Sequence, residues 1–157
     1  PVHAGLGIAL YQRGRFRPAV DSMIRALGIE PDLPYALSLR LFSGHSLREL
    51  GDIPAAGRQY ELAVDIEPEN REALNYLAAS LSELKRYEEA HERYLELIEL
   101  DADNAVAHAS HGVVLHHLGR NAEALARVER ALELDPALEQ AHKAREEVRK
   151  ALGLTDP

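Results

Sequence analysis

The chain has 157 residues, of which 46% are hydrophobic and 28% are charged, so it can bury an ordinary globular core. Its formal net charge of −8 would repel phosphate backbones, so we do not expect nucleic acid as a partner. The absence of cysteine excludes disulfides and thiolate metal sites, and no apolar run approaches the roughly 20 residues that cross a bilayer, so no membrane insertion is expected. The compartment stays unknown, with the cytoplasm as the default.

Four short markers recur along the chain, one of them in RALGIEP at residues 25–31 and again in RALELDP at 130–136. Successive copies of each marker are separated by 37, 34 and 34 residues. The markers are Pro31, Pro68, Ala102 and Pro136; Ala19, Ala56, Ala90 and Ala124; Gly7, Gly44, Ala78 and Gly112; and Ala26, Ala63, Leu97 and Ala131. Because four independent markers share the same steps, we predict four copies of one repeat, at about residues 1–34, 35–70, 71–104 and 105–138.

Each repeat predicts two helices joined by a turn. Apolar residues of the third repeat recur with helical period at Leu74, Leu77, Leu81 and Leu84, and after a short break at Tyr87, Ala90, Tyr94 and Leu97. Gly14, Gly51 and Gly119 stand where the first helix must end, a place that favours a left-handed backbone. The third repeat has Lys85 at that place.

The step from the first to the second repeat contains three extra residues, which fall within DLPYALSLRLFS, before Gly44. Asp32 can cap a helix whose first turn accepts Pro34. We therefore predict that the first helix of the second repeat starts nearly one turn early, so that Leu33 and Tyr35 project beyond the neighbouring helices. The alternative is a longer loop.

The period continues past Pro136 into a final helix at about residues 138–152. Glu146 stands where the repeat requires a small residue, so a further helix cannot pack there. The pairs Glu139 with Lys143 and Glu146 with Lys150 have the spacing of helix surface pairs. This is the pattern of a capping helix with a solvent-facing side.

A 34-residue unit with Leu-Gly early, two alanines in its second helix and a closing proline resembles the tetratricopeptide repeat. The matching residues are Leu6, Gly7, Phe16, Ala19, Ala26 and Pro31, and later Gly112, Leu115, Ala124, Ala131 and Pro136. Histidines fill the early aromatic position, and Ala102 replaces one proline. The resemblance implies an all-α fold, a right-handed α-α superhelix (solenoid) of four hairpins plus a capping helix, as a single domain over residues 1–157.

Three motifs suggest chemistry, and each has a simpler interpretation. His108 and His111 share a helix face, but His108 stands in the repeat position that also holds His3 and His142, and no carboxylate set completes a metal site. His116 and His117 diverge on a helix, as do the histidine and serine of GHS at 44–46, and GLGIAL at 5–10 lacks the third glycine of a dinucleotide fingerprint. We expect no catalytic residue, no metal and no cofactor, and therefore no enzyme.

The resemblance implies a non-enzymatic scaffold whose first helices line a concave groove for a partner protein or peptide. The rows expected to face the groove are Ala4, Ile8 and Tyr11; Leu41, His45 and Arg48; Asn75, Ala79 and Ser82; and Ala109, Val113 and His116. Family members that grip a terminal carboxylate use lysines and asparagines here, and only Asn75 is of that kind. We therefore predict a peptide or helix with apolar anchors as the ligand.

Two alternatives remain open, a self-association module and a regulatory arm of a larger multidomain protein. The sequence starts with PVHAGLGIAL, already inside the first predicted helix. The resulting end face would expose Val2, Leu6, Ala9 and Leu10 without a complete partner. We expect upstream residues of a longer chain, or a second copy in a homo-oligomer, to cover this N-terminal end face.

Overall fold

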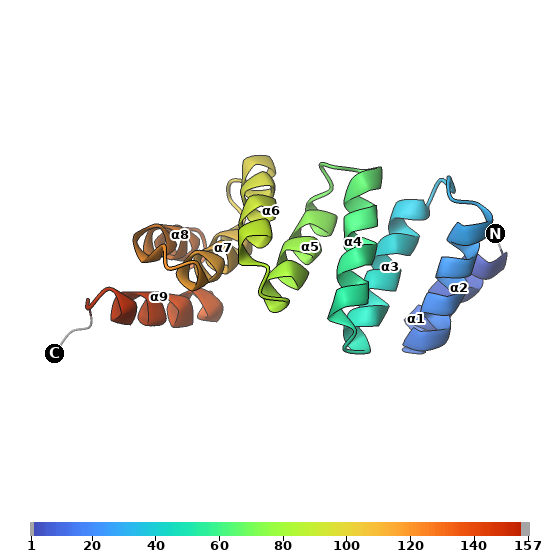
Figure 1. The fold of residues 1–157 in the computed structure, drawn as a ribbon, viewed down its shortest axis with the longest axis horizontal. Helices are drawn as coiled ribbons and strands as arrows, with labels where there is room; N and C mark the ends of the chain where they lie inside the picture. The colour runs from blue at the N-terminus through green and yellow to red at the C-terminus, as the bar shows by residue number, and fades with distance from the viewer. Residues whose placement is uncertain (1, 155–157) are drawn as a thin grey trace. The chain divides into compact units, whose positions relative to one another are not determined.

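The computed structural model describes residues 2–154, which form nine α-helices and no strands (Figure 1). In chain order the helices are α1 (Val2–Gln12), α2 (Phe16–Ile29), α3 (Ala36–Glu49), α4 (Ile53–Ile66), α5 (Arg71–Glu83), α6 (Tyr87–Leu100), α7 (Ala105–His117), α8 (Asn121–Leu134) and α9 (Glu139–Ala151). The all-α repeat fold predicted from the marker spacing is thereby confirmed. No helix within residues 2–154 combines the length and the apolar character that a membrane span requires.

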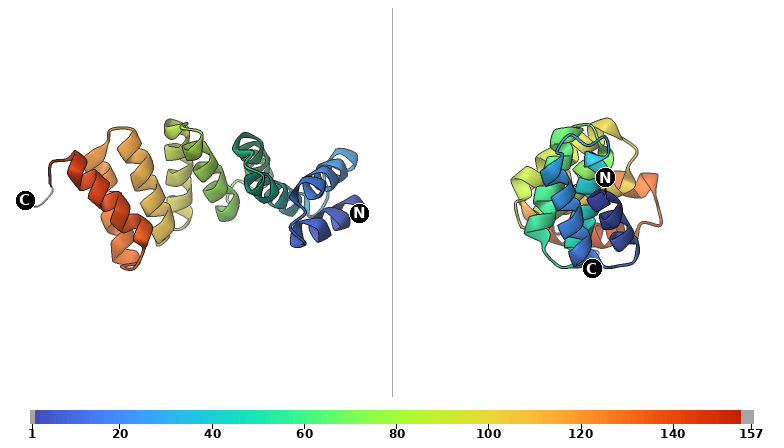
Figure 2. Two further views of the ribbon diagram at one scale, coloured as in Figure 1. Left: turned by 90° about the horizontal axis from the view of Figure 1, so that it is seen from below. Right: turned by 90° about the vertical axis from the view of Figure 1, so that its right-hand side faces the viewer.

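The chain divides into two compact units, Pro1–Ser80 and Leu81–Pro157, which we call the N-terminal unit and the C-terminal unit. Helices α1 to α4 and most of α5 belong to the N-terminal unit, where α1 packs on α2, α2 on α3 and α3 on α4. In the C-terminal unit α7 packs on α6 and α8, and the views in Figures 1 and 2 agree in placing α9 alongside α7 and α8. Within each unit, helices thus pack mainly on helices that are close in sequence.

Small residues set how closely the two helices of a hairpin approach. The alanine marker on the second helices, Ala19, Ala56, Ala90 and Ala124, is fully buried in all four copies. The facing glycines of three hairpins each meet one side chain, which is Met23 for Gly7, Tyr60 for Gly44 and Val128 for Gly112. A Cβ atom added to any of these glycines would overlap that side chain. The repeated small residues are therefore explained by close contacts between the two helices of a hairpin.

One backbone geometry closes the turn inside every hairpin. The N–H of the residue before the second helix bonds the carbonyl five positions earlier, for example Arg86 to Leu81 and Arg120 to Leu115, both at 2.9 Å. The intervening residue has a positive φ, which is 75° at Gly119 and 60° at Lys85. Lys85 adopts a conformation that costs a side-chain-bearing residue about 1–2 kcal/mol. The turn is therefore imposed by the hairpin even where glycine is missing.

The predicted early start of the first helix in the second repeat is wrong. Helix α3 begins at Ala36, so residues 33–35 lie in a turn, and the N-cap residue is Tyr35 and not Asp32. Leu33 is only 7% exposed and joins the core that contains Met23 and Leu39, so it does not project outward. The physical reason is that helical backbone is disfavoured for a residue before a proline, which favours a position of Leu33 outside the helix. The extra residues mostly lengthen the loop, and that loop is anchored by Leu33.

Polar side chains tie the loops to the starts of several first helices. The side chain of Asn104 accepts a hydrogen bond from the Ala107 N–H at 3.0 Å, and Asn70 caps α5 in the same way. His108 Nε2 lies 3.0 Å from the carbonyl oxygen of Ala102, and His142 Nε2 lies 2.8 Å from that of Pro136. Histidine therefore fills the early aromatic position with a side chain that also binds the preceding loop.

Candidate functional site

A pocket of about 370 Å³ lies on the surface of the N-terminal unit. Its lining residues are Tyr11, Phe42, His45, Arg48, Glu49, Glu72 and Tyr76, and we call it the aromatic pocket. All seven residues come from α1, α3 and α5, which are the first helices of three successive hairpins. The repeat geometry thus brings together residues that are more than sixty positions apart in the sequence.

Three aromatic rings form the apolar part of the aromatic pocket. The ring centroids of Tyr11 and Phe42 are 5.0 Å apart with a tilt of 34°. Tyr76 stacks on Tyr60 at 5.3 Å and meets the His45 ring edge-on at 4.5 Å. These distances fall in the range of favourable aromatic pairs, so the rings hold one another in place. Tyr11, Phe42 and Tyr76 are each only half-buried and remain accessible in the pocket.

The orientation of the His45 ring is set by one hydrogen bond at each of its two nitrogens. Its Nδ1 lies 2.9 Å from the hydroxyl oxygen of Tyr60, and its Nε2 lies 3.3 Å from Oε1 of Glu72. Burial raises the pKa of Tyr60, so this hydroxyl keeps its proton and can donate to Nδ1. Because a carboxylate only accepts, the Nε2–H of His45 donates to Glu72. This arrangement fixes both His45 and Glu72 at the pocket.

The charged groups of the aromatic pocket carry a negative excess. Glu49 and Glu72 are both exposed, and the Glu72 side chain is 56% exposed. Arg48 is half-buried, and its Nη1 lies 3.4 Å from the hydroxyl oxygen of Ser80. The carboxylates of Glu49 and Glu72 are therefore more exposed to solvent than Arg48, whose guanidinium contacts Ser80.

Three of the predicted groove residues, Tyr11, His45 and Arg48, line the aromatic pocket. Leu41 is buried, and Ile8 packs against the core that contains Met23, so these two apolar side chains belong to packing. The other predicted groove residues do not line the aromatic pocket: Ala4 and Ala109 are buried, and five are half-buried, namely Asn75, Ala79, Ser82, Val113 and His116.

Four residues of the aromatic pocket were missed by the sequence prediction: Phe42, Glu49, Glu72 and Tyr76. The predicted row on α3 ran through Leu41, whereas the accessible row runs through Phe42, His45 and Glu49, one residue further round the helix. Glu72 and Tyr76 are separated by one helical turn and form the equivalent row on α5. The sequence signal for the row on α3 was the spacing of Phe42, His45 and Glu49, which are three and then four residues apart and so share one helix face.

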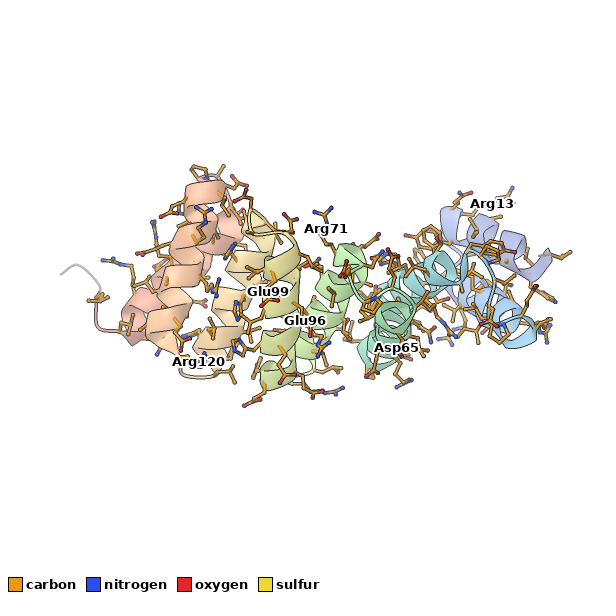
Figure 3. The ribbon with its side chains drawn as sticks, turned by 90° about the horizontal axis from the view of Figure 1, so that it is seen from above. Arg13, Asp65, Arg71, Glu96, Glu99 and Arg120 are labelled. Atoms are coloured by element: carbon orange, nitrogen blue, oxygen red, sulfur yellow. The ribbon has the colours of Figure 1, made fainter. Side chains whose placement is uncertain are left out.

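The histidines singled out in the sequence have structural partners in the C-terminal unit. His91 Nδ1 lies 2.6 Å from His111 Nε2, and Arg120 Nη1 lies 3.0 Å from His91 Nε2. Arg120, labelled in Figure 3, directly precedes α8. Burial, followed by nearby Arg127, lowers the pKa of His111 to about 3, so the histidine pair is neutral near pH 7.

The other two histidines pack locally. His116 Nδ1 bonds Asn121 Oδ1 at 2.7 Å, and the His117 ring stacks on Tyr87 at 4.6 Å. Among residues 2–154, no group of three or more histidine, aspartate or glutamate side chains is arranged so that it could hold a metal ion. Val113 lines a separate pocket of about 400 Å³ beside α9, whose exposed Lys143 pairs with Glu139 at 2.9 Å.

The sequence matches the tetratricopeptide repeat family over residues 43–105 and 80–139, which together cover more than half of the chain. The chain therefore belongs to the tetratricopeptide repeat family. A search of curated proteins finds no sequence that matches it significantly.

Several solved structures share the fold. A crystal structure of the MamA protein is 18% identical, with 98% of this chain and 82% of that chain covered and a TM-score of 0.89. A tetratricopeptide repeat protein from Parabacteroides merdae ATCC 43184 is 21% identical, with 96% and 59% covered and a TM-score of 0.87. The first tetratricopeptide repeat of Spaghetti (RPAP3) bound to the HSP90 peptide SRMEEVD is 22% identical, with 74% and 93% covered and a TM-score of 0.71. At these identities the similarity shows the fold alone.

Proposed function

We propose that this protein is an interaction scaffold without enzymatic activity, and that it binds a segment of a partner protein on the first helices of the N-terminal unit. The aromatic pocket is the anchor site for one side chain of that segment. The observation that carries this proposal is a pocket built by three successive first helices, with accessible rings on each of them. Buried aromatic anchors commonly provide most of the affinity in such interfaces.

Two further facts support the proposal. Family membership fits a scaffold, and a structural neighbour, the Spaghetti (RPAP3) repeat, is described as bound to a peptide. The pocket also has an arrangement suited to recognition: His45 is held by Tyr60 and Glu72, so part of the binding surface is ordered before a ligand arrives. A preordered surface loses less conformational entropy on binding.

The proposal is tested by selecting peptides that bind the full chain from a random display library and measuring their affinity for pocket variants. We expect Tyr11→Ala and Phe42→Leu each to weaken binding about tenfold, because each removes a ring from the anchor site. Leu62→Ala is the matched control, since Leu62 is partly exposed on α4 and lies outside the aromatic pocket. Circular dichroism should show unchanged helicity in all three variants. Selected peptides that bind every variant equally would place the binding site elsewhere.

Self-association through the N-terminal end face is the second candidate function. It is favoured by the exposure of apolar residues in the first repeat whose equivalents in later repeats are buried. Val2 is 82% exposed and Leu6 is 49% exposed, whereas their counterparts Leu39 and Leu77 are 0% and 7% exposed. Leu6 also lines a surface pocket together with Ile24 and Ile29 on α2. We propose that a second copy of the chain can cover this apolar face.

Light scattering over a range of protein concentrations tests the second candidate. We expect the molar mass to rise with concentration in the wild type and to stay at the monomer value in Leu6→Glu. The control is Leu154→Glu, which places the same charge at an exposed leucine outside the end face. A wild type that stays monomeric throughout would reject self-association and leave the peptide-binding proposal intact.

A further inference from the structure

We infer that the aromatic pocket takes a basic side chain, arginine or lysine, from the partner segment. This inference rests on the proposed function and specifies the chemistry of the anchor. It also differs from the apolar anchor that the sequence predicts, because Leu41 is buried, the half-buried Ile8 packs against the core, and neither lines the pocket.

The first argument is the geometry of the rings. Tyr11 and Phe42 lie 5.0 Å apart on neighbouring helices, and Tyr76 is held by its stack on Tyr60, so rings border the pocket from α1, α3 and α5. A guanidinium or ammonium group within about 6 Å of an aromatic face is attracted by the negative potential of the ring. A long aliphatic stem, as in arginine or lysine, can pack on the rings while its charged end stays near water.

The second argument is the placement of charge. Glu49 and Glu72 are both exposed at the pocket, and Glu72 is oriented by the Nε2–H of His45. Carboxylates so placed can each accept a hydrogen bond from a cationic side chain, and such charge-assisted bonds are stronger than neutral ones. Arg48 is the sole cation among the seven lining residues, and it lies half-buried with Nη1 3.4 Å from Ser80. The charges of the pocket therefore favour a cation over an anion.

The third argument is the charge of the whole chain. A formal net charge of −8 attracts basic segments and repels acidic ones at long range. The same two carboxylates would repel an acidic peptide or a terminal carboxylate placed in the pocket. An uncharged apolar anchor would pack on the rings but would form no charge-assisted hydrogen bond with Glu49 or Glu72.

The test uses peptides selected by display against the full chain. We expect one arginine or lysine to recur at a fixed position, and its replacement by norleucine to weaken binding about tenfold while keeping the length of the stem. Glu49→Gln and Glu72→Gln should each weaken binding of the basic peptide several-fold and leave the norleucine peptide unaffected. Glu61→Gln is the matched control, because Glu61 is exposed on α4 outside the pocket.

The outcomes separate the inference from the proposed function. If peptides lose affinity with Phe42→Leu but bind equally well with norleucine, the pocket binds an apolar anchor and the basic-anchor inference is wrong. If selected peptides are indifferent to Phe42→Leu, or if none is selected, the proposed function itself fails. Weaker binding in 0.5 M salt for the basic peptide alone would support the inference, because salt screens charge pairs at an exposed site.

Discussion

Gly112→Ala tests whether helix contacts in this protein are as close as the repeated glycines indicate. In an open helix interior, alanine is favoured over glycine by about 1 kcal/mol. Here an added Cβ would overlap Cγ2 of Val128 and would lie 3.2 Å from the carbonyl oxygen of Ala124. Both neighbours are fully buried, so relieving the overlap requires α7 and α8 to move apart. Overpacking of this kind costs about 1–3 kcal/mol, so we expect a net loss of about 1 kcal/mol.

Urea denaturation followed by circular dichroism measures this loss as a lower midpoint. Gly28→Ala is the control, because a Cβ at this glycine of α2 would meet nothing within 4 Å and should stabilise the protein by up to about 1 kcal/mol. Combined with Val128→Ala, Gly112→Ala should lower stability by less than the sum of the two single losses, since the second change removes the overlapping methyl group. If Gly112→Ala raises the midpoint as much as Gly28→Ala does, the close packing of α7 on α8 is refuted.

Other predictions concern single sites. Lys85→Gly should raise the thermal midpoint by stabilising the turn by about 0.5–1 kcal/mol, since φ is +60° there; an unchanged midpoint would contradict the strained turn. Asn104→Ala should cost about 1 kcal/mol in urea unfolding, because it removes the cap of α7. Ala124→Leu should cost about 1–3 kcal/mol by overpacking, and a variant that melts with the wild type would show the repeat alignment to be wrong. The pKa of His111 is lowered to about 3 in the folded protein, so the unfolded chain binds a proton at this residue more readily than the folded chain does. The free energy of unfolding should therefore be highest above about pH 6.5 and should fall by up to about 1.4 kcal/mol per pH unit below it. Urea midpoints at pH 7.5 and 5.0 should therefore differ less in His111→Leu than in the wild type.

The helices and turns were predictable because the same helix contact or turn, where it recurs in several repeats, requires the same kind of residue at the same position. A close helix crossing tolerates only a small residue, so Gly44 and Gly112 recur at the same position of each repeat. The turn after the first helix was equally clear at Gly119. Lys85 showed that the period of the neighbouring repeats carries enough information to assign a turn even where the favoured residue is absent.

The start of α3 and the lining of the aromatic pocket were not predictable in the same way. Both depend on features found once in the chain, so no second copy was available for comparison. Leu33 is drawn into the core beside Leu39, which decides the path of the longer loop. Phe42 is accessible and its neighbour Leu41 is buried, and which of the two faces the core depends on how α3 packs on α2 and α4.

The pairing of His91 with His111 was missed for a related reason. The two residues lie on α6 and α7, which belong to different predicted repeats, and histidines do not recur at both positions elsewhere. The sequence drew attention to the histidines that are close together in the chain. The structure instead joins two that are 20 residues apart.

The side chains that face the repeated glycines differ from hairpin to hairpin, being Met23 opposite Gly7, Tyr60 opposite Gly44 and Val128 opposite Gly112. The repeats look interchangeable in sequence, yet each hairpin has its own matched pair of surfaces. Moving a complete hairpin to another place in the chain would carry both members of the pair along. Exchanging one helix alone would bring a tyrosine where a valine fits. In recombination between repeats, whether by evolution or by design, the hairpin is therefore the smallest piece that can be moved without repacking its interior.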